Sequence, residues 1–152
     1  FTPVPTYATN KKARFDYDIR QTFEAGISLS GQEVKSARGG HISLSGSYVV
    51  IHGDKPYLLN ARISPYPYAG HLEGYEPERS RVLLLKQSEI DYIKRKTDAE
   101  GLTIVPLSVY TKGPKIKTEI ALGKGKKKYD KRETIKNREN EREVKRKIKY
   151  NE

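Results

Sequence analysis

The chain contains no cysteine, no methionine and no tryptophan. Without cysteine it has no disulfide framework, no thiol nucleophile and no thiolate ligand for a zinc or iron–sulfur site. Apolar residues are also scarce, at 35% of the 152 residues, and no apolar run is long enough to cross a membrane or to form the apolar centre of a secretory signal. We therefore expect a cytoplasmic protein of one domain with an extension. Because position 1 is not methionine, Phe1 is not expected to be the first translated residue.

The charge that is present is mostly positive. Lysine and arginine number 30 against 19 acidic residues, a net charge of +11. This excess favours a polyanionic partner, nucleic acid first and an anionic membrane surface second. Residues 1–122 hold 17 basic and 13 acidic side chains, a net of +4, whereas residues 123–152 hold 13 and 6, a net of +7. The first region must therefore rely on a local basic patch.

Residues 10–122 have the pattern of a β-rich domain. Short runs of β-branched and aromatic residues, separated by turn residues, predict strands at 19–29, 47–51, 56–59, 81–85, 102–110 and 116–122, and the strand at 81–85 is expected to be buried. A bulge or bend is expected at Glu24 and Gly26, and Pro106 requires an edge or bulge position. Helices are expected over 32–38 and 88–100, and an exposed loop over 64–78. These elements predict a mainly β fold, a small closed barrel with two or three flanking helices.

The remaining residues form the two ends of the chain, an N-terminal extension (1–9) and a basic tail (123–152) around the barrel (10–122). Residues 130–150 contain no glycine or proline but few apolar side chains, so we predict a tail that is disordered alone and helical in a polyanionic groove. Composition alone also allows a solvated, disordered tail. Gly123–Lys128 lacks the spacing of a phosphate-binding loop and is interpreted as a basic hinge.

Motifs for catalysis are missing. The histidines have no metal-binding spacing, and the glutamates of the 64–78 loop are interpreted as solvated. No nucleophile motif is present, so no enzyme activity, metal or cofactor is predicted.

The positive signal is a segment in which cations alternate with rings. Asn10–Tyr17 holds three cations and two aromatic rings within eight residues, which suits neutralisation of phosphates and stacking on exposed bases. The alternative is that Phe15 and Tyr17 are core residues. Glu24 lies among apolar or small neighbours and is expected to be partly buried. It is either an internal salt-bridge partner or an acceptor for base amino and imino groups.

Several of these segments together resemble the bacterial SsrA-binding protein family, also called small protein B. The matching stretches are Asn10–Arg14 (NKKAR) with Tyr17, Thr22–Ile27 (TFEAGI), Gly31–Ser36 (GQEVKS), Ile63–Tyr66 (ISPY), Arg79–Arg81 (RSR) with Leu83–Leu85 (LLL), Gly101–Pro106 (GLTIVP), and Gly123–Lys127 (GKGKK) with Asp130–Glu133 (DKRE). Seven stretches in this order make the match specific, and it runs from about residue 8 to the C-terminus.

The resemblance implies an OB-like barrel that binds the tRNA-like domain of transfer-messenger RNA and delivers it to stalled ribosomes without catalysis. It implies RNA contacts by Asn10, Lys11, Glu24, Leu84 and Lys117, to which charge and proximity add Lys12 and Arg14. The tail would enter the vacant decoding centre and messenger channel of the small subunit, against ribosomal RNA. The residues assigned to that role are Lys124, Lys126, Lys127, Lys128, Tyr129, Asp130, Lys131 and Arg132. A monomer that needs no membrane is expected.

One residue departs from the family pattern. The position before Asp130 is often histidine in the family and is Tyr129 here. A tyrosine ring still stacks on a base, but it cannot supply a protonated imidazole. The alternative function is a general OB-type protein for ribosomal or other structured RNA, and an RNA-processing enzyme is the weaker alternative.

Overall fold

The computed structural model describes residues 5–70 and 72–126. The predicted tail helix therefore lies outside the described residues, and so do Lys127, Lys128, Tyr129, Asp130, Lys131 and Arg132.

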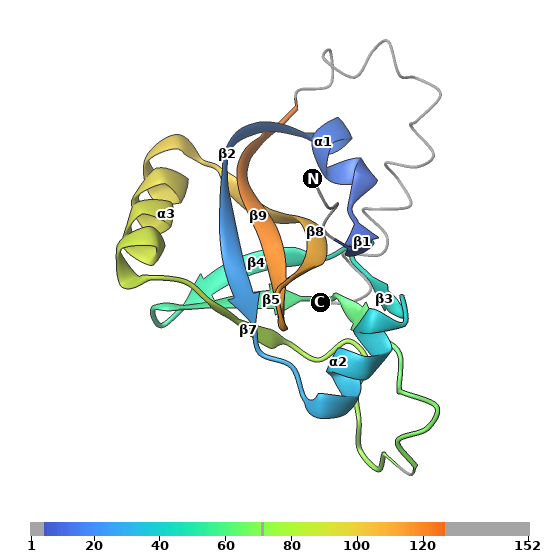
Figure 1. Ribbon diagram of the computed structural model, residues 1–152. Helices are drawn as coiled ribbons and strands as arrows, with labels where there is room; N and C mark the ends of the chain where they lie inside the picture. The colour runs from blue at the N-terminus through green and yellow to red at the C-terminus, as the bar shows by residue number, and fades with distance from the viewer. Residues whose placement is uncertain (1–4, 71, 127–152) are drawn as a thin grey trace.

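The centre of the molecule is a closed antiparallel barrel (Figure 1). Going round the ring, the strands are β8 (Thr103–Lys112), β4 (Tyr48–His52), β5 (Lys55–Leu59), β7 (Arg81–Leu84), β2 (Tyr17–Ile27) and β9 (Lys115–Gly125), and β9 pairs back onto β8. Two further pairings are added by β1 (Thr6–Thr9) on β8 and by β3 (Ile42–Ser43) with β6 (Arg62–Ile63). The expected mainly β fold with a small closed barrel is confirmed, and part of the expected N-terminal extension adds a strand to it.

Local turn chemistry explains the two tight hairpins. The β4–β5 hairpin turns at Gly53 and Asp54, whose φ angles of 57° and 66° match the type of turn that favours glycine and aspartate. The β8–β9 hairpin turns at Gly113, with a φ of 60°. Pro106 lies at a register shift between β8 and β9, as predicted, because proline cannot donate to a regular ladder.

Two details of the predicted strands are wrong. The irregularity in β2 lies between Ile19 and Gln21 and not at Glu24 or Gly26, because the ladder to β9 is continuous through those two residues. The strand predicted as buried over 81–85 alternates instead. Arg81 and Leu83 face the interior, whereas 61% of Leu84 is exposed. A charged side chain, Arg81, thus occupies an interior position, while a leucine of the same strand faces solvent.

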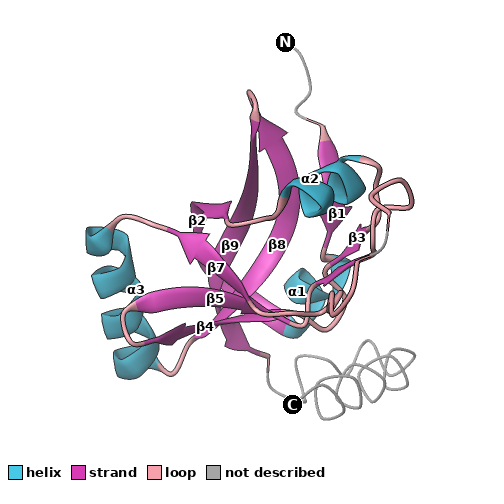
Figure 2. Cartoon of the chain, turned by 90° about the horizontal axis from the view of Figure 1, so that it is seen from below, coloured by secondary structure: helices cyan, strands magenta, loops and turns pink. Residues whose placement is uncertain are grey.

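Within the described part of the chain, three helices flank the barrel (Figure 2). Both predicted helices are present, as α2 (Gly31–Arg38) and α3 (Gln87–Glu100). Ser30 and Glu33 form a capping box at the start of α2, and Gly101 ends α3 with a φ of 63°. A third helix, α1 (Lys11–Asp16), forms from the basic and aromatic segment. Among the described residues, no helix is long and apolar enough to span a bilayer.

The core fills the barrel, and its largest fully buried apolar side chains are contributed by several strands and one helix. They include Leu58, Leu83, Ile93, Ile120 and Leu122. Burial of such side chains, at roughly 1.5–3 kcal/mol each, provides the main driving force for the fold. The loop over 64–70 and 72–78 has no helix or strand, as predicted, but Tyr75 points inward rather than into solvent.

Candidate RNA-binding surface

The described residues predicted to contact RNA fall into two groups at opposite ends of β2 (Figure 1). The α1 group comprises Asn10, Lys11, Lys12 and Arg14, and the sheet group comprises Glu24, Leu84 and Lys117. From Tyr17 to Gly26, β2 extends for roughly 30 Å of strand at about 3.3 Å per residue. The structure therefore gathers each group but does not join the two groups into one patch.

Asn10 fixes α1 to the barrel. Its side-chain amide donates to the carbonyl oxygen of Pro106 at 3.0 Å, and its backbone N–H donates to that of Leu107 at 2.8 Å. Ala13 is buried on the inner side of the helix. Lys11 and Arg14 are consequently left exposed, while Lys12 is half-buried. Asn10 thus has a positioning role in addition to any contact with RNA.

Two of the cations predicted for the ribosome lie beside the α1 group. Lys124 on β9 pairs with Asp18 in the ladder and is exposed. The backbone N–H of Lys126 donates to Asp16 at 3.0 Å, and its ammonium lies 6.0 Å from the centre of the Phe15 ring. Both rings are half-buried. Phe15 makes this cation–π contact, whereas Tyr17 packs against a small core cluster. Neither ring is fully buried, and Tyr17 is the one that contacts the core.

The sheet group lies in a row across neighbouring strands. Gly26 pairs with Leu84 on one side and with Lys117 on the other, and Lys117 pairs with Tyr110 on β8. Directly paired residues point to the same face of a sheet, so the row shares the outer face of the barrel. A Cβ atom on Gly26 would lie 3.2 Å from the Cβ atom of Leu84. Because glycine has no side chain, Leu84 can pack over this position.

Glu24 belongs to the same outer face, two residues before Gly26. Its side chain is 37% exposed, so Glu24 is partly covered, and it lies on the outer face and not in the interior of the barrel. The hydroxyl of Tyr110 donates to Oε2, and the ammonium of Lys112 lies 3.2 Å from Oε1. The hydrogen bond from Tyr110, followed by that from Lys112, lowers the pKa of Glu24 below its usual value. The ionised carboxylate still has lone pairs available to further donors.

Tyr110 and Lys112 were not predicted as site residues. Alternation along β8 places both on one face, and the hairpin at Gly113 sets Tyr110 opposite Lys117. The sequence shows this alternation and the hairpin. The contact of Tyr110 and Lys112 with Glu24 also depends on β9, which lies between β8 and β2 and pairs with both.

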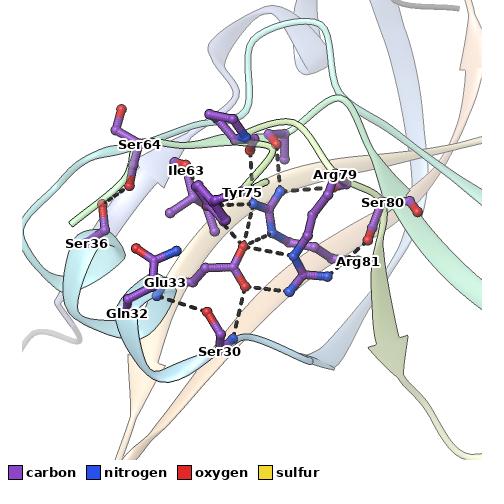
Figure 3. Close-up of polar contacts among 12 residues, drawn as sticks. Ser30, Gln32, Glu33, Ser36, Ile63, Ser64, Tyr75, Arg79, Ser80 and Arg81 are labelled. Atoms are coloured by element: carbon purple, nitrogen blue, oxygen red, sulfur yellow. Dashed lines mark hydrogen bonds and ion pairs between the residues drawn. The ribbon is translucent and has the colours of Figure 1, made fainter. Parts of the chain in front are cut away.

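A second glutamate, Glu33, was also missed, and it is completely buried in a polar network (Figure 3). Arg81 donates to its Oε2 atom at 3.0 and 2.6 Å, and Arg79 contacts both carboxylate oxygens. The Tyr75 hydroxyl lies 3.1 Å from the same Oε2, and the Ser30 N–H donates to Oε1 at 2.9 Å. This network ties α2 to the 64–80 loop and to β7.

The network determines the charge of Glu33. Burial raises the pKa of this carboxyl, but hydrogen bonds from Arg79, Ser30 and Arg81 outweigh burial and lower the pKa to about 2. Arg81 is itself fully buried and donates further to the carbonyl oxygens of Ala61 and Pro77. With so many donors already on the carboxylate, Glu33 holds the fold together and has no capacity left for a ligand.

The residues predicted to contact RNA, with their neighbours, therefore offer exposed cations, the ionised carboxylate of Glu24 and accessible rings. Cations suit phosphates, and a carboxylate accepts from the amino and imino groups of bases. Within residues 5–70 and 72–126, no cluster of three or more histidine, aspartate or glutamate side chains is placed to hold a metal ion.

Comparison with known proteins gives concordant results. The SmpB protein family matches residues 7–150. The SsrA-binding protein of Oleidesulfovibrio alaskensis is 47% identical over 141 residues, which covers 93% of this chain and 90% of the relative. That of Chlorobium luteolum is 51% identical over 136 residues, covering 89% and 86% of the two chains. Among solved structures, a chain from "tmRNA-SmpB: a journey to the center of the bacterial ribosome" is 38% identical, with a TM-score of 0.65 over 97% of both chains.

Proposed function

The chain belongs to the SmpB protein family, and we propose that it binds transfer-messenger RNA and brings it to stalled ribosomes for trans-translation. The observation that carries this function is the similarity over 97% of both chains to a protein solved in a study of transfer-messenger RNA and the ribosome. Curated relatives named SsrA-binding protein match over most of their own length, which supports the same assignment.

Within this function, the two groups on the barrel are the proposed contacts for the tRNA-like domain. The α1 group supplies exposed cations for phosphates. In the sheet group, Glu24 accepts hydrogen bonds from a base, Lys117 provides charge and Leu84 provides apolar contact. Because the groups lie at opposite ends of β2, they would contact separate parts of one folded RNA.

The basic tail is the proposed contact with the ribosome. It carries a net charge of +7 in residues 123–152, which suits a channel lined by ribosomal RNA. Lys124 and Lys126 mark where the tail leaves the barrel, and Tyr129 to Arg132 would occupy the decoding centre. Messenger RNA would exclude the tail sterically, so a stalled ribosome is recognised by its empty channel.

This role is one of binding and delivery, and it needs no chemical step by the protein. We place it in the cytoplasm with the ribosomes, acting as a monomer. A general protein for structured RNA is the alternative, and it would show no preference for the tRNA-like domain.

The deciding experiment is to sequence the RNA that co-purifies with the full-length protein and then to measure competition by bulk tRNA. We expect enrichment of transfer-messenger RNA and poor competition. Equal binding of both RNAs would favour the general RNA-binding alternative.

The tail is tested separately by deletion of residues 130–152. The shortened protein should bind transfer-messenger RNA with unchanged affinity but fail to support peptide tagging on stalled ribosomes. Normal tagging by the shortened protein would contradict the role of the tail and leave the role of the barrel intact.

A further inference from the structure

A cleft of about 320 Å³ opens beside the α1 group. One wall comes from β1 and α1, and the other from the segment that runs from β3 into β4. Its lining includes Lys11, Lys12, Tyr17, Ser43, Leu44 and Tyr48. The cleft thus joins cations of the α1 group to a hollow that none of the predicted contacts explains.

The chemistry of the cleft is layered. Leu44 lies deep and is only 2% exposed, and Ile42, Ala13 and Val105 add to the same apolar lining. Tyr48 contributes a half-buried ring, and Ser43 and Ser45 are exposed hydroxyl-bearing residues in the lining. Lys11 is exposed and Lys12 half-buried. Asp16 at the end of α1 also lines the cleft, so the cationic side is the one formed by Lys11 and Lys12. An apolar hollow, hydroxyl groups and cations together match the base, the ribose and the phosphate of a nucleotide.

The size of the cleft limits what it can hold. About 320 Å³ is at the small end of the roughly 300–1,000 Å³ typical of small-molecule sites, which suits one nucleotide and not a stack of base pairs. Single unstacked bases are also what proteins recognise most readily in a structured RNA, since the base edges of paired RNA are poorly accessible.

We propose that this cleft takes one unpaired nucleotide of the bound RNA, with its base against the Leu44 and Tyr48 side and its phosphate toward Lys11 and Lys12. The proposal rests on the proposed function for the identity of the RNA. It adds a specific subsite beside the cations of the α1 group, which otherwise contribute charge alone.

The test fills the cleft without changing charge. Ser43→Trp places a large ring at an exposed position of the lining, and Ser45→Trp does so from the neighbouring turn. Ser88→Trp is the matched control, because Ser88 is exposed on α3 and does not line the cleft. All three full-length variants are checked by thermal unfolding before their affinity for the tRNA-like domain of transfer-messenger RNA is measured over a range of salt concentrations.

Filling the cleft should weaken binding about tenfold, the effect of losing roughly one stacked base. The slope of log affinity against log salt should stay unchanged, because no phosphate contact is lost. Lys11→Ala should instead lower that slope by about one contact. In the wild-type complex one base should be protected from base-specific chemical reagents, and Ser43→Trp or Ser45→Trp should expose it again.

The proposal is overturned if a folded Ser43→Trp or Ser45→Trp variant binds like Ser88→Trp and leaves every base protected as in the wild type. Should one variant not fold, the other and the wild-type protection pattern decide. Failure of the proposed function would give a different result from failure of the cleft proposal. In that case the wild-type protein itself would show no preference for the tRNA-like domain over bulk tRNA.

Discussion

Two glutamates of this protein have the same kinds of partner and opposite surroundings. Glu24 contacts a tyrosine hydroxyl and a lysine on the outer face of the barrel, with 37% of its side chain exposed. Glu33 contacts a tyrosine hydroxyl and two arginines, with none of its side chain exposed. Both carboxyls have a lowered pKa and are ionised at neutral pH.

The difference lies in how many donors each carboxylate already has. Donors surround Glu33 on both oxygens, so its charge serves only to hold α2, the 64–80 loop and β7 together. Glu24 has one donor on each oxygen and an open side toward solvent. Similar contacts therefore stabilise the fold at Glu33, whereas at Glu24 they leave the carboxylate able to accept a hydrogen bond from a ligand.

The largest expected effect is that of Glu33→Gln on stability. The amide keeps the size of the side chain but leaves Arg81 buried without its ion pair, which typically costs 3–5 kcal/mol, and we expect a loss of about that size. Urea unfolding measures it, with Glu24→Gln as the control. A loss below about 1 kcal/mol would show that the network contributes little.

A second prediction concerns pH. The pKa of Glu33 is lowered from 4.5, the value taken for the unfolded chain, to about 2 in the folded protein. The ionised carboxylate therefore contributes its full stabilisation well above pH 4.5, and this stabilisation is lost as the pH falls toward 2. The difference corresponds to about 3 kcal/mol. Unfolding measured across this range should show a fall in stability that is much smaller in Glu33→Gln. Parallel pH profiles for the two proteins would contradict the assignment.

Some features of the fold can be predicted from the sequence alone, and others cannot. The Gly53–Asp54 hairpin and the Gly101 helix end are predictable because the backbone angles there are a local property of glycine and aspartate. The α1 helix is not, since it is short and depends on bonds from Asn10 to β8. Arg81 within an apolar strand was a visible signal of a buried charge. Its partner, however, lies 48 residues away on another element, and no periodicity connects the two.

The sites divide in the same way. A run of cations such as that around Lys11 is visible in sequence because it is contiguous. The sheet group is assembled by strand register, so the row of Leu84, Gly26 and Lys117 is invisible until the pairing is known. Family resemblance supplied those residues, and the register explains why they belong together.

The third prediction is that Glu24→Gln weakens RNA binding. Electrostatics alone predicts tighter binding, because the change removes a negative charge from an RNA-binding surface. A carboxylate that accepts from a base predicts the opposite, a loss of about tenfold for one good base contact. Affinity for the tRNA-like domain measures the sign directly. Stability should change by less than about 0.5 kcal/mol, as for most surface substitutions. Unchanged or tighter binding would leave Glu24 as a surface ion-pair partner of Lys112.

The smallest effects come from the two tyrosines. Tyr110→Phe removes the hydroxyl that orients Glu24, so RNA affinity should fall by a few-fold, corresponding to roughly 1 kcal/mol for one hydrogen bond, with little change in stability. Tyr75→Phe removes the hydroxyl near Glu33 and the carbonyl of Ile63, so stability should fall by about 1 kcal/mol with RNA affinity unchanged. Both changes delete one oxygen from the same residue type, and each serves as the control for the other. If both variants lost stability, or both lost affinity, the division between an open and a saturated carboxylate would be wrong. A crossed result would establish that donor saturation, and not the chemical identity of the partners, distinguishes the RNA-binding glutamate from the structural one.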